Sequence, residues 1–349
     1  MSSSHFGRID VPMVLMALLL TGHALRGTAA MAPTCPQFTD VSLSAPLTRG
    51  DRAASFPGGI VAYVRTLHVD ADGASSAYHP DDIGVDLLCN GLEPFDGKRC
   101  VPVKPDGEAA CRDAVHAAQF VQWKRAASPT FCMFGFEAPS ETLAPNSKHK
   151  HLWGGKYGGG ELPLQQSDEP APGFFRSTTS ASLPPLKRGG PRRYVQADVI
   201  PFIVMPTSYL AGDNRAVTRG AAGIVSVRQG HWVPAIVGDA RNIEAMGEVS
   251  IAAAQLILSP RQSRPVVPTA EQLRKGEKLP APYNKKSDGT VRANQNPDDG
   301  PYLVFSFGAR YGRVSDFALE SIRTLSTAAF DKFGGAQAIA QCARDHFER

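Results

Sequence analysis

The sequence predicts an α+β domain that is mainly β. Apolar runs rich in β-branched and aromatic residues recur at 60–69, 223–239 and 302–308, each with the length of a strand or a hairpin. Only three segments show helical patterning, at 106–126, 248–258 and 315–333. This order is neither a strict strand–helix alternation nor an all-helical pattern, so a mainly β domain with peripheral helices and long loops is expected.

The elements of the first half are few. The run IVAYVRTLHV at 60–69 predicts a strand, and DADG at 70–73 predicts the turn after it. A helix is expected over 106–126, with Cys111 and Val115 on one face. Gly, Pro and Ser dominate 138–190, which we interpret as long loops.

The second half is more regular. The run at 194–206 predicts one or two strands, with Pro201 excluded from a central position. The run at 223–239 predicts a hairpin turning at Gln229–Gly230, and EVSIAAAQLIL at 248–258 predicts a helix. The Pro- and Lys-rich segment 259–300 predicts a long surface excursion. A strand at 302–308 precedes a helix over 315–333 that Gly334 and Gly335 end.

The N-terminus predicts a secretion signal. Arg8 supplies a positive charge, Val11–Leu20 form an apolar core, and Gly27–Ala30 offer small residues for cleavage. The core is shorter than the roughly 20 apolar residues that span a bilayer. We expect residues 1–30 to be a cleaved signal peptide, an uncleaved anchor being the alternative. Residues 31–349 are then one domain of a secreted or periplasmic protein with no further membrane contact, and we expect a monomer.

Cysteine and charge patterns agree with export. Six cysteines lie beyond the predicted cleavage point, and no Cys-x-x-Cys pair occurs, which favours disulfides over a metal ribbon. Four of them fall between 89 and 132, so local bridges are expected there, with the pairing left open. The formal net charge of +4 is scattered along the chain, so no nucleic-acid partner is expected.

Two carboxylates at the edges of regular elements are the candidate catalytic pair. Asp239 follows Gly238 at a predicted strand end, and Glu248 follows Gly247 in the first turn of a predicted helix. A protonated and an ionised carboxyl group can together hydrolyse a glycosidic bond without a cofactor. The alternative is structural, since aspartate often ends a strand in a turn and glutamate often caps a helix.

The region 70–86 is the most acidic part of the chain. Asp70, Asp72 and Asp86 could form subsites that bind ammonium groups, or an ordinary turn and solvated loop. A calcium site is a third interpretation, although the spacing is not that of the helix–loop–helix calcium loop. Tyr78 could stack on a sugar or belong to the core, as could Trp232. Asp198, before a predicted strand, could orient a catalytic group or be structural. No nucleophile elbow, zinc-hydrolase, phosphate-loop or dinucleotide motif is present, so neither a metal nor a cofactor is implied.

Four blocks resemble glycoside hydrolase family 75, the chitosanase family of fungi and bacteria. GDARNIEAMGEVSIAAA at 238–254 resembles the family signature of a strand, Gly-Asp, a short loop and Gly-Glu-x-Ser before a small-residue helix. Residues 69–91, 171–180 and 192–206 are similar to its Asp-rich block and central strands, in the same order. The run at 300–308 corresponds loosely to a closing strand.

The resemblance implies a secreted, endo-acting hydrolase of β-1,4 linkages in chitosan or partly acetylated chitosan. It implies inversion, with Asp239 as general base and Glu248 as general acid, on a six-stranded β-barrel-like core of the double-psi kind. One departure is Arg241–Asn242, where the bacterial pattern often has Gly-Pro; it brings a cation to the presumed cleft. A non-catalytic binding protein for amino-sugar wall polymers and a hydrolase of peptidoglycan therefore stay open as alternatives.

Overall fold

The structure is a computed structural model that describes most of the chain beyond residue 34. The described residues are 35–43, 46–101, 112–113, 115–116, 130–133, 135–137, 152–153, 164–168, 170–181, 194–210, 219–227, 230–241 and 245–349. The predicted signal segment and most of the predicted helix 106–126 lie outside them. Residues 112–113 and 115–116 of that helix are helical.

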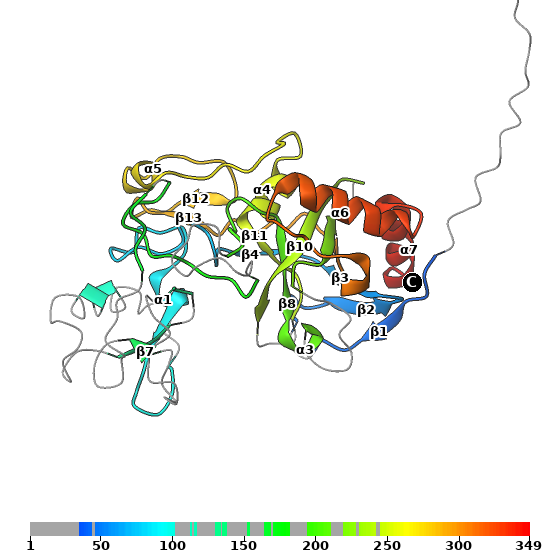
Figure 1. Ribbon diagram of the computed structural model, residues 1–349, viewed down its shortest axis with the longest axis horizontal. Coiled ribbons are helices and arrows are strands. Elements are labelled where there is room, and N and C mark those ends of the chain that lie inside the picture. Colours follow the sequence, from blue (N-terminus) through cyan, green and yellow to red (C-terminus); the bar gives the residue numbers. More distant parts are fainter. Residues whose placement is uncertain are drawn as a thin grey trace, which may run out of the picture. The chain divides into compact units, whose positions relative to one another are not determined.

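A nine-stranded sheet dominates the fold, so the expectation of a mixed, mainly β protein is confirmed (Figure 1). Its spatial order is β1-β2-β3-β14-β9-β10-β8-β11-β4. The bounds are β1 (Thr39–Val41), β2 (Arg52–Phe56), β3 (Gly59–Val64), β4 (His68–Asp70), β8 (Phe202–Pro206), β9 (Ala222–Ser226), β10 (Trp232–Arg241), β11 (Glu248–Ser250) and β14 (Tyr302–Phe307). Neighbours are antiparallel except for β10 with β8 and β11 with β4.

The predicted strand 60–69 is two strands in the structure. β3 pairs with β14, and β4 pairs with β11, with only residues 65–67 between them. Among the described strands, one short stretch of chain therefore supplies both β3 and β4, which lie far apart in the strand order. The predicted hairpin is confirmed as β9 and β10, and the predicted strand at 302–308 is β14, all of whose residues are buried. In the run 194–206 only β8 is a strand.

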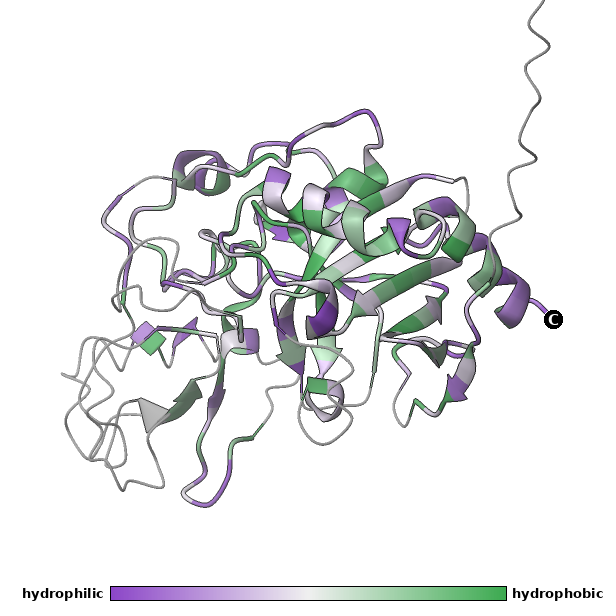
Figure 2. Ribbon diagram, turned by 45° about the vertical axis from the view of Figure 1, so that its right-hand side comes forward, coloured by the Kyte–Doolittle hydropathy of each residue, from purple (hydrophilic) through white to green (hydrophobic). Residues whose placement is uncertain are grey.

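Three helices cover the sheet. They are α4 (Ile251–Leu258), α6 (Leu319–Asp331) and α7 (Ala336–Phe347). Helix α6 buries Ile322, Ala329 and Phe330, the inward face that the sequence predicts, although Leu319 is only partly buried. The apolar colouring of Figure 2 gathers on the strands and on the helix faces toward them. The predicted helix 248–258 was wrong at its start, because Glu248–Ser250 form β11 and α4 begins at Ile251.

The segment 259–300 has its own regular structure. It contains α5 (Ala270–Arg274) and the hairpin of β12 (Tyr283–Lys285) and β13 (Val291–Ala293). Leu273, Tyr283 and Val291 are buried in the core that also holds the Asp-rich region. The segment is therefore more than a surface excursion, because it supplies packing to the loop 70–86.

The remaining elements are short. A three-stranded sheet consists of β5 (Leu92–Pro94), β6 (Phe131–Met133) and β7 (Leu152–Trp153). The short helices are α1 (Leu88–Gly91), α3 (Thr207–Leu210) and a 3-10 turn at Ala309–Tyr311. Within the described ranges, no helix has both the length and the apolar character that crossing a membrane requires.

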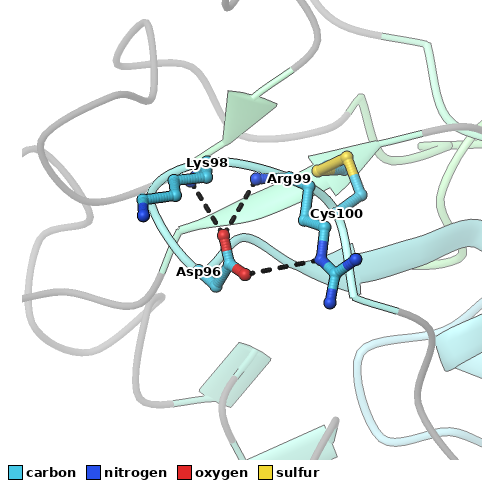
Figure 3. Close-up of a disulfide and its surroundings, with 5 residues drawn as sticks. Asp96, Lys98, Arg99 and Cys100 are labelled. Atoms are coloured by element: carbon cyan, nitrogen blue, oxygen red, sulfur yellow. Dashed lines mark hydrogen bonds and ion pairs between the residues drawn. A yellow bond between two sulfur atoms is a disulfide. The ribbon is translucent and has the colours of Figure 1, made fainter.

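The expectation of disulfides is confirmed for two pairs. Cys100–Cys132 is a local bridge, and Cys35–Cys342 joins residues 307 positions apart. Cys89 is also disulfide-bonded, and no cysteine in the described part of the chain is free. Beside Cys100, Asp96 accepts hydrogen bonds from the backbone N–H groups of Lys98 and Arg99, which shapes the turn before the bridge (Figure 3).

Candidate active site

Asp239 is held at a bulge in β10. The register between β10 and β8 shifts between Val237 and Asp239, and such a bulge re-aims the side chain that follows it. Gly238 is needed there, because a Cβ atom would lie 2.4 Å from Cβ of Phe202. Oδ1 of Asp239 accepts backbone N–H groups from Ser180 at 2.8 Å and Ala240 at 2.7 Å. The carboxylate is thus fixed in one orientation, with its side chain almost fully buried.

Glu248 lies on strand β11 and not in a helical turn, which corrects the sequence prediction. The N-cap of α4 is Ser250, so the helix dipole acts two residues beyond Glu248. Gly247 turns the chain into β11 with φ +111°, a conformation that favours glycine, and its carbonyl accepts the N–H of His68 at 2.8 Å. Oε2 of Glu248 lies 2.6 Å from Nη1 of Arg241. The cation predicted to sit near the cleft therefore contacts the candidate acid directly.

Asp70 and Asp72 join Asp239 in a tight cluster. One oxygen from each of the three carboxyl groups lies within 4.8 Å of the others. Strand pairing explains part of this proximity, because β4 runs beside β11 with Ser250 opposite Asp70 and Glu248 opposite His68. Residues two apart on a strand share a face, so Asp70 and Glu248 are expected on the same side of the sheet.

Crowding shifts the titration of this cluster. Burial, and then the charges of Asp72, Asp239 and Glu248, raise the pKa of Asp70 well above its usual value. Burial and then Asp239 raise the pKa of Asp72 in the same way. Burial also raises the pKa of Asp239, against the backbone hydrogen bonds that favour its anion. The cluster therefore retains protons at a pH at which isolated aspartates are ionised.

Asp86 and Tyr78 extend the cluster. The Tyr78 hydroxyl lies 2.6 Å from Oδ1 of Asp72 and 3.0 Å from Oδ2 of Asp86. Asp86 also accepts hydrogen bonds from Nδ2 of Asn90 and from the N–H of Leu87. Tyr78 is only 1% exposed, so its ring cannot stack on a sugar, which corrects that interpretation. It belongs to the core and presents its hydroxyl to the two aspartates.

Asp198 lies apart from this group. It is fully buried and accepts the N–H and the hydroxyl of Ser75 on Oδ2, at 3.1 and 2.6 Å. The burial and the contacts with Ser75 agree with the structural one of its two interpretations. Its role in this structure is to hold the loop that follows Asp72. Trp232 likewise packs against a core cluster of the sheet, the structural one of its two interpretations.

Arg292 is a site residue that the sequence did not reveal. From β13 it donates hydrogen bonds to the carbonyls of Asp82, Gly84 and Asp86, and its Nη2 lies 3.0 Å from Oδ2 of Asp82. The guanidinium therefore fixes the loop that carries Asp86. No local motif marks it, since its partners lie about 200 residues earlier. A single arginine in an alternating β run was the only available signal.

A cleft of about 590 Å³ is lined by two of these carboxylates, Glu248 and Asp86, whereas Asp70, Asp72 and Asp239 are not among its lining residues. His68 lines it too, as do Lys286, Thr290 and Asn294 of the β12–β13 region. Asn90 and Asn296 add further amide groups. The volume is in the range of small-ligand sites, and its polar lining suits a hydroxyl-rich ligand.

The arrangement can do two kinds of chemistry. Carboxyl groups with raised pKa values and ionised partners can transfer protons to and from a substrate. Three carboxylate oxygens within 4.8 Å could alternatively hold a divalent cation, with Asp70, Asp72 and Asp239 as ligands. The Tyr78 hydroxyl beside Asp72 favours the proton-sharing arrangement.

No family model matches this chain, and no curated protein sequence matches it.

Proposed function

We propose that the protein is a secreted, endo-acting glycoside hydrolase that cleaves β-1,4 linkages in chitosan or partly acetylated chitosan with inversion. Asp239 acts as the general base that activates water, and Glu248 acts as the general acid. The proposal extends the resemblance of residues 238–254 to the signature of glycoside hydrolase family 75.

One observation carries this proposal. Asp70 and Asp72 lie in one stretch of the chain and Asp239 and Glu248 in another, more than 160 residues later, yet their charges act on one another. Four carboxylates gathered around a single ion pair, that of Glu248 with Arg241, are costly to the fold, and such arrangements cluster at functional sites. Two of them are the residues on which the motif resemblance independently places the catalysis.

The surroundings of the pair support the two roles. Two backbone N–H groups favour the anion of Asp239, as a base requires. Burial raises the pKa of Glu248, against the opposing charge of Arg241, and the charge of Asp239 raises it further. A raised pKa favours the protonated form that a general acid needs.

The cleft supports an amino-sugar polymer as substrate. Asp86 and Asp288 line the cleft and supply negative charge that glucosamine ammonium groups would pair with, whereas Asp70 and Asp72 are not among its lining residues. Lys286 and the amides of Asn90 and Asn294 on the cleft wall supply hydrogen-bonding groups and a cation, which fit hydroxyl and acetamido groups better than a fully cationic chain. Partly acetylated chitosan combines both chemistries.

The strand order supports a closed six-stranded core. β3 and β4, at the two ends of the order β3-β14-β9-β10-β8-β11-β4, are parts of one stretch interrupted by three residues. Counting that stretch once gives six strands, the number expected for the proposed double-psi barrel. The parallel pairs β10–β8 and β11–β4 fit such a mixed barrel.

Export supports the same function, because the polymers concerned lie outside the cell. The disulfides fit an oxidising compartment. We propose a secreted or periplasmic monomer that is released from its signal peptide.

A binding protein without activity is the second candidate. The contact between Arg241 and Glu248 favours it, because a paired, ionised glutamate cannot donate a proton. In that case the carboxylate cluster holds amino-sugar residues without cutting the chain between them.

The deciding experiment measures reducing ends released from soluble chitosans of graded acetylation. Wild type should release them, whereas Asp239→Asn and Glu248→Gln should each lower the rate by at least about 100-fold. Glu320→Gln, at an exposed position of α6, serves as the matched control. Binding without release by the wild type would favour the second candidate, and release of fragments from purified peptidoglycan alone would redirect the substrate.

A further inference from the structure

A buried tyrosine hydroxyl lies between two carboxyl groups of the candidate site. Oη of Tyr78 is 2.6 Å from Oδ1 of Asp72 and 3.0 Å from Oδ2 of Asp86. Both separations are within the range of O–H···O hydrogen bonds.

Packing fixes this position. The ring of Phe136 lies edge-on against the Tyr78 ring, with centroids 4.9 Å apart. Two glycines leave room for the ring and its partner: a Cβ at Gly135 would lie 2.9 Å from Oδ1 of Asp72, and a Cβ at Gly91 would lie 3.1 Å from Cζ of Tyr78. Close packing therefore holds the hydroxyl between the two carboxyl groups.

The two hydrogen bonds need two protons. A phenol has one hydrogen, and an ionised carboxylate is only an acceptor. If both aspartates were ionised, one of the two contacts would bring together oxygen atoms with no hydrogen between them. One of the two carboxyl groups must therefore carry a proton and donate it to Oη.

Asp72 is the better holder of that proton. Oδ1 of Asp86 already accepts two N–H groups, from Asn90 and Leu87, which favour its ionised form. Asp72 instead lies beside the carboxyl groups of Asp70 and Asp239, so a second negative charge there is opposed.

We propose that Tyr78 is a positioning residue that keeps a proton on Asp72, accepting a hydrogen bond from that carboxyl group while donating its own hydrogen to Asp86. The consequence for the site is electrostatic. A neutral Asp72 removes one negative charge from beside Asp239, so the base can ionise. The effect on activity rests on the proposed function. The assignment of the proton to Asp72 does not depend on that function.

The charged groups that face this network come from four elements. They are Asp70 on β4, Asp239 on β10, Glu248 on β11 and Arg292 on β13. Burial raises the pKa of both Asp72 and Asp86. The charges of Asp239 and Glu248 raise the pKa of Asp72 further, and Asp70 and Asp72 oppose each other's ionisation, whereas the charge of Arg292 lowers the pKa of Asp86. This asymmetry favours the same distribution, with a neutral Asp72 and an ionised Asp86.

Infrared difference spectroscopy tests the proton directly. At pH 7 the wild type should show the C=O stretch of a protonated carboxyl group that is missing from Asp72→Asn. The band should weaken in Tyr78→Phe, which removes one oxygen atom and keeps the packed ring. An identical band in wild type and Asp72→Asn would overturn the proposal, even if no activity were ever found.

The pH profile of kcat/KM tests the effect on the base. In Tyr78→Phe, Asp72 should ionise at lower pH. Its negative charge then raises the pKa of Asp239, so the acidic limb of the kcat/KM profile moves to higher pH by about one unit. Asp86→Asn should move the limb in the same direction, because its amide can donate to Oη and free the phenolic hydrogen for Asp72. Asp72→Asn, which mimics the neutral form, should leave the limb in place whatever it does to the rate. An acidic limb that does not move in Tyr78→Phe, with unchanged melting temperature, would show a role confined to packing.

Discussion

Arg241 and Glu248 form a direct ion pair, with Nη1 and Oε2 2.6 Å apart, at the edge of the cleft. The pair joins the end of β10 to the start of β11, on either side of the short connection that carries the motif. It stabilises the ionised glutamate, whereas burial and the charge of Asp239 favour the protonated one. The working pH range of the site therefore depends on this arginine.

Replacing Arg241 with glutamine should move the basic limb of kcat/KM to higher pH. The arginine lowers the pKa of Glu248, so its loss raises that pKa, and an acid that must be protonated then works at higher pH. We expect about one unit, the usual effect of one nearby charge. Arg323→Gln on α6, whose ion pair is exposed, is the control, and a limb that moves to lower pH would contradict the acid role of Glu248.

Asp70→Asn should stabilise the protein at alkaline pH. The folded-state pKa of Asp70 is raised by burial and then by Asp72, Asp239 and Glu248, so the wild type loses stability as pH rises from the unfolded pKa through the folded one. Asparagine is neutral throughout, so the variant avoids that loss. Melting temperatures should differ at pH 8 and converge at pH 4. Asp331→Asn on the exposed face of α6 should show no such trend.

Arg292→Met should destabilise the fold by about 3–5 kcal/mol, because it removes one partner of a buried ion pair and leaves three carbonyls without their donor. Urea denaturation measures this loss. Arg323→Met removes an exposed arginine of the same length and should cost under about 1 kcal/mol. Equal effects of the two changes would mean that the loop carrying Asp86 is held by other contacts.

Ser250→Ala should cost roughly 2–4 kcal/mol. Its hydroxyl oxygen accepts the N–H groups of Ala253 and Phe202, and its hydrogen is donated to the carbonyl of Ile200. The change therefore removes the cap of α4 and leaves buried backbone groups of β8 and its approach unpaired. Ser287→Ala, at an exposed turn, is the matched control and should be nearly neutral.

Chelation should leave the activity unchanged. The proposed mechanism uses protons and water alone, so dialysis against EDTA should not alter the rate of reducing-end release. A rate that falls with EDTA and returns with Ca²⁺ or Mg²⁺ would instead assign Asp70, Asp72 and Asp239 to a cation.

Local patterns predicted the elements whose structure depends on local sequence. The hairpin of β9 and β10 follows from two β-branched runs around a glycine turn, and α6 follows from its apolar spacing and the glycines after it. Glu248 was misplaced because EVSIAAA suits a helix start, whereas pairing with β4, far away in the chain, makes its first three residues a strand. Propensity carries no information about such a partner.

For the candidate site, too, the sequence indicated which residues lie near one another in the chain, but not which residues the fold brings together. The acidic residues at 70, 72 and 86 were visible as a cluster in sequence, but only the fold brings Asp239 among them. For Tyr78 the sequence left sugar stacking and a core position open, and for Asp198 an orienting role and a structural one; both residues are buried. A single sequence gives residue types and not exposure, so a polar group that orders a loop looks the same as one that meets a ligand.

The bridge between Cys35 and Cys342 has a consequence for how the protein can be dissected. It closes nearly the whole described chain into one covalent ring, because its two ends lie 307 residues apart in sequence. A protease that cuts once inside this ring opens it without releasing a piece. Fragments from such a cut should separate on a gel only after reduction. Until then the nicked protein stays one covalently linked molecule, so the residues on the two sides of the cut remain together.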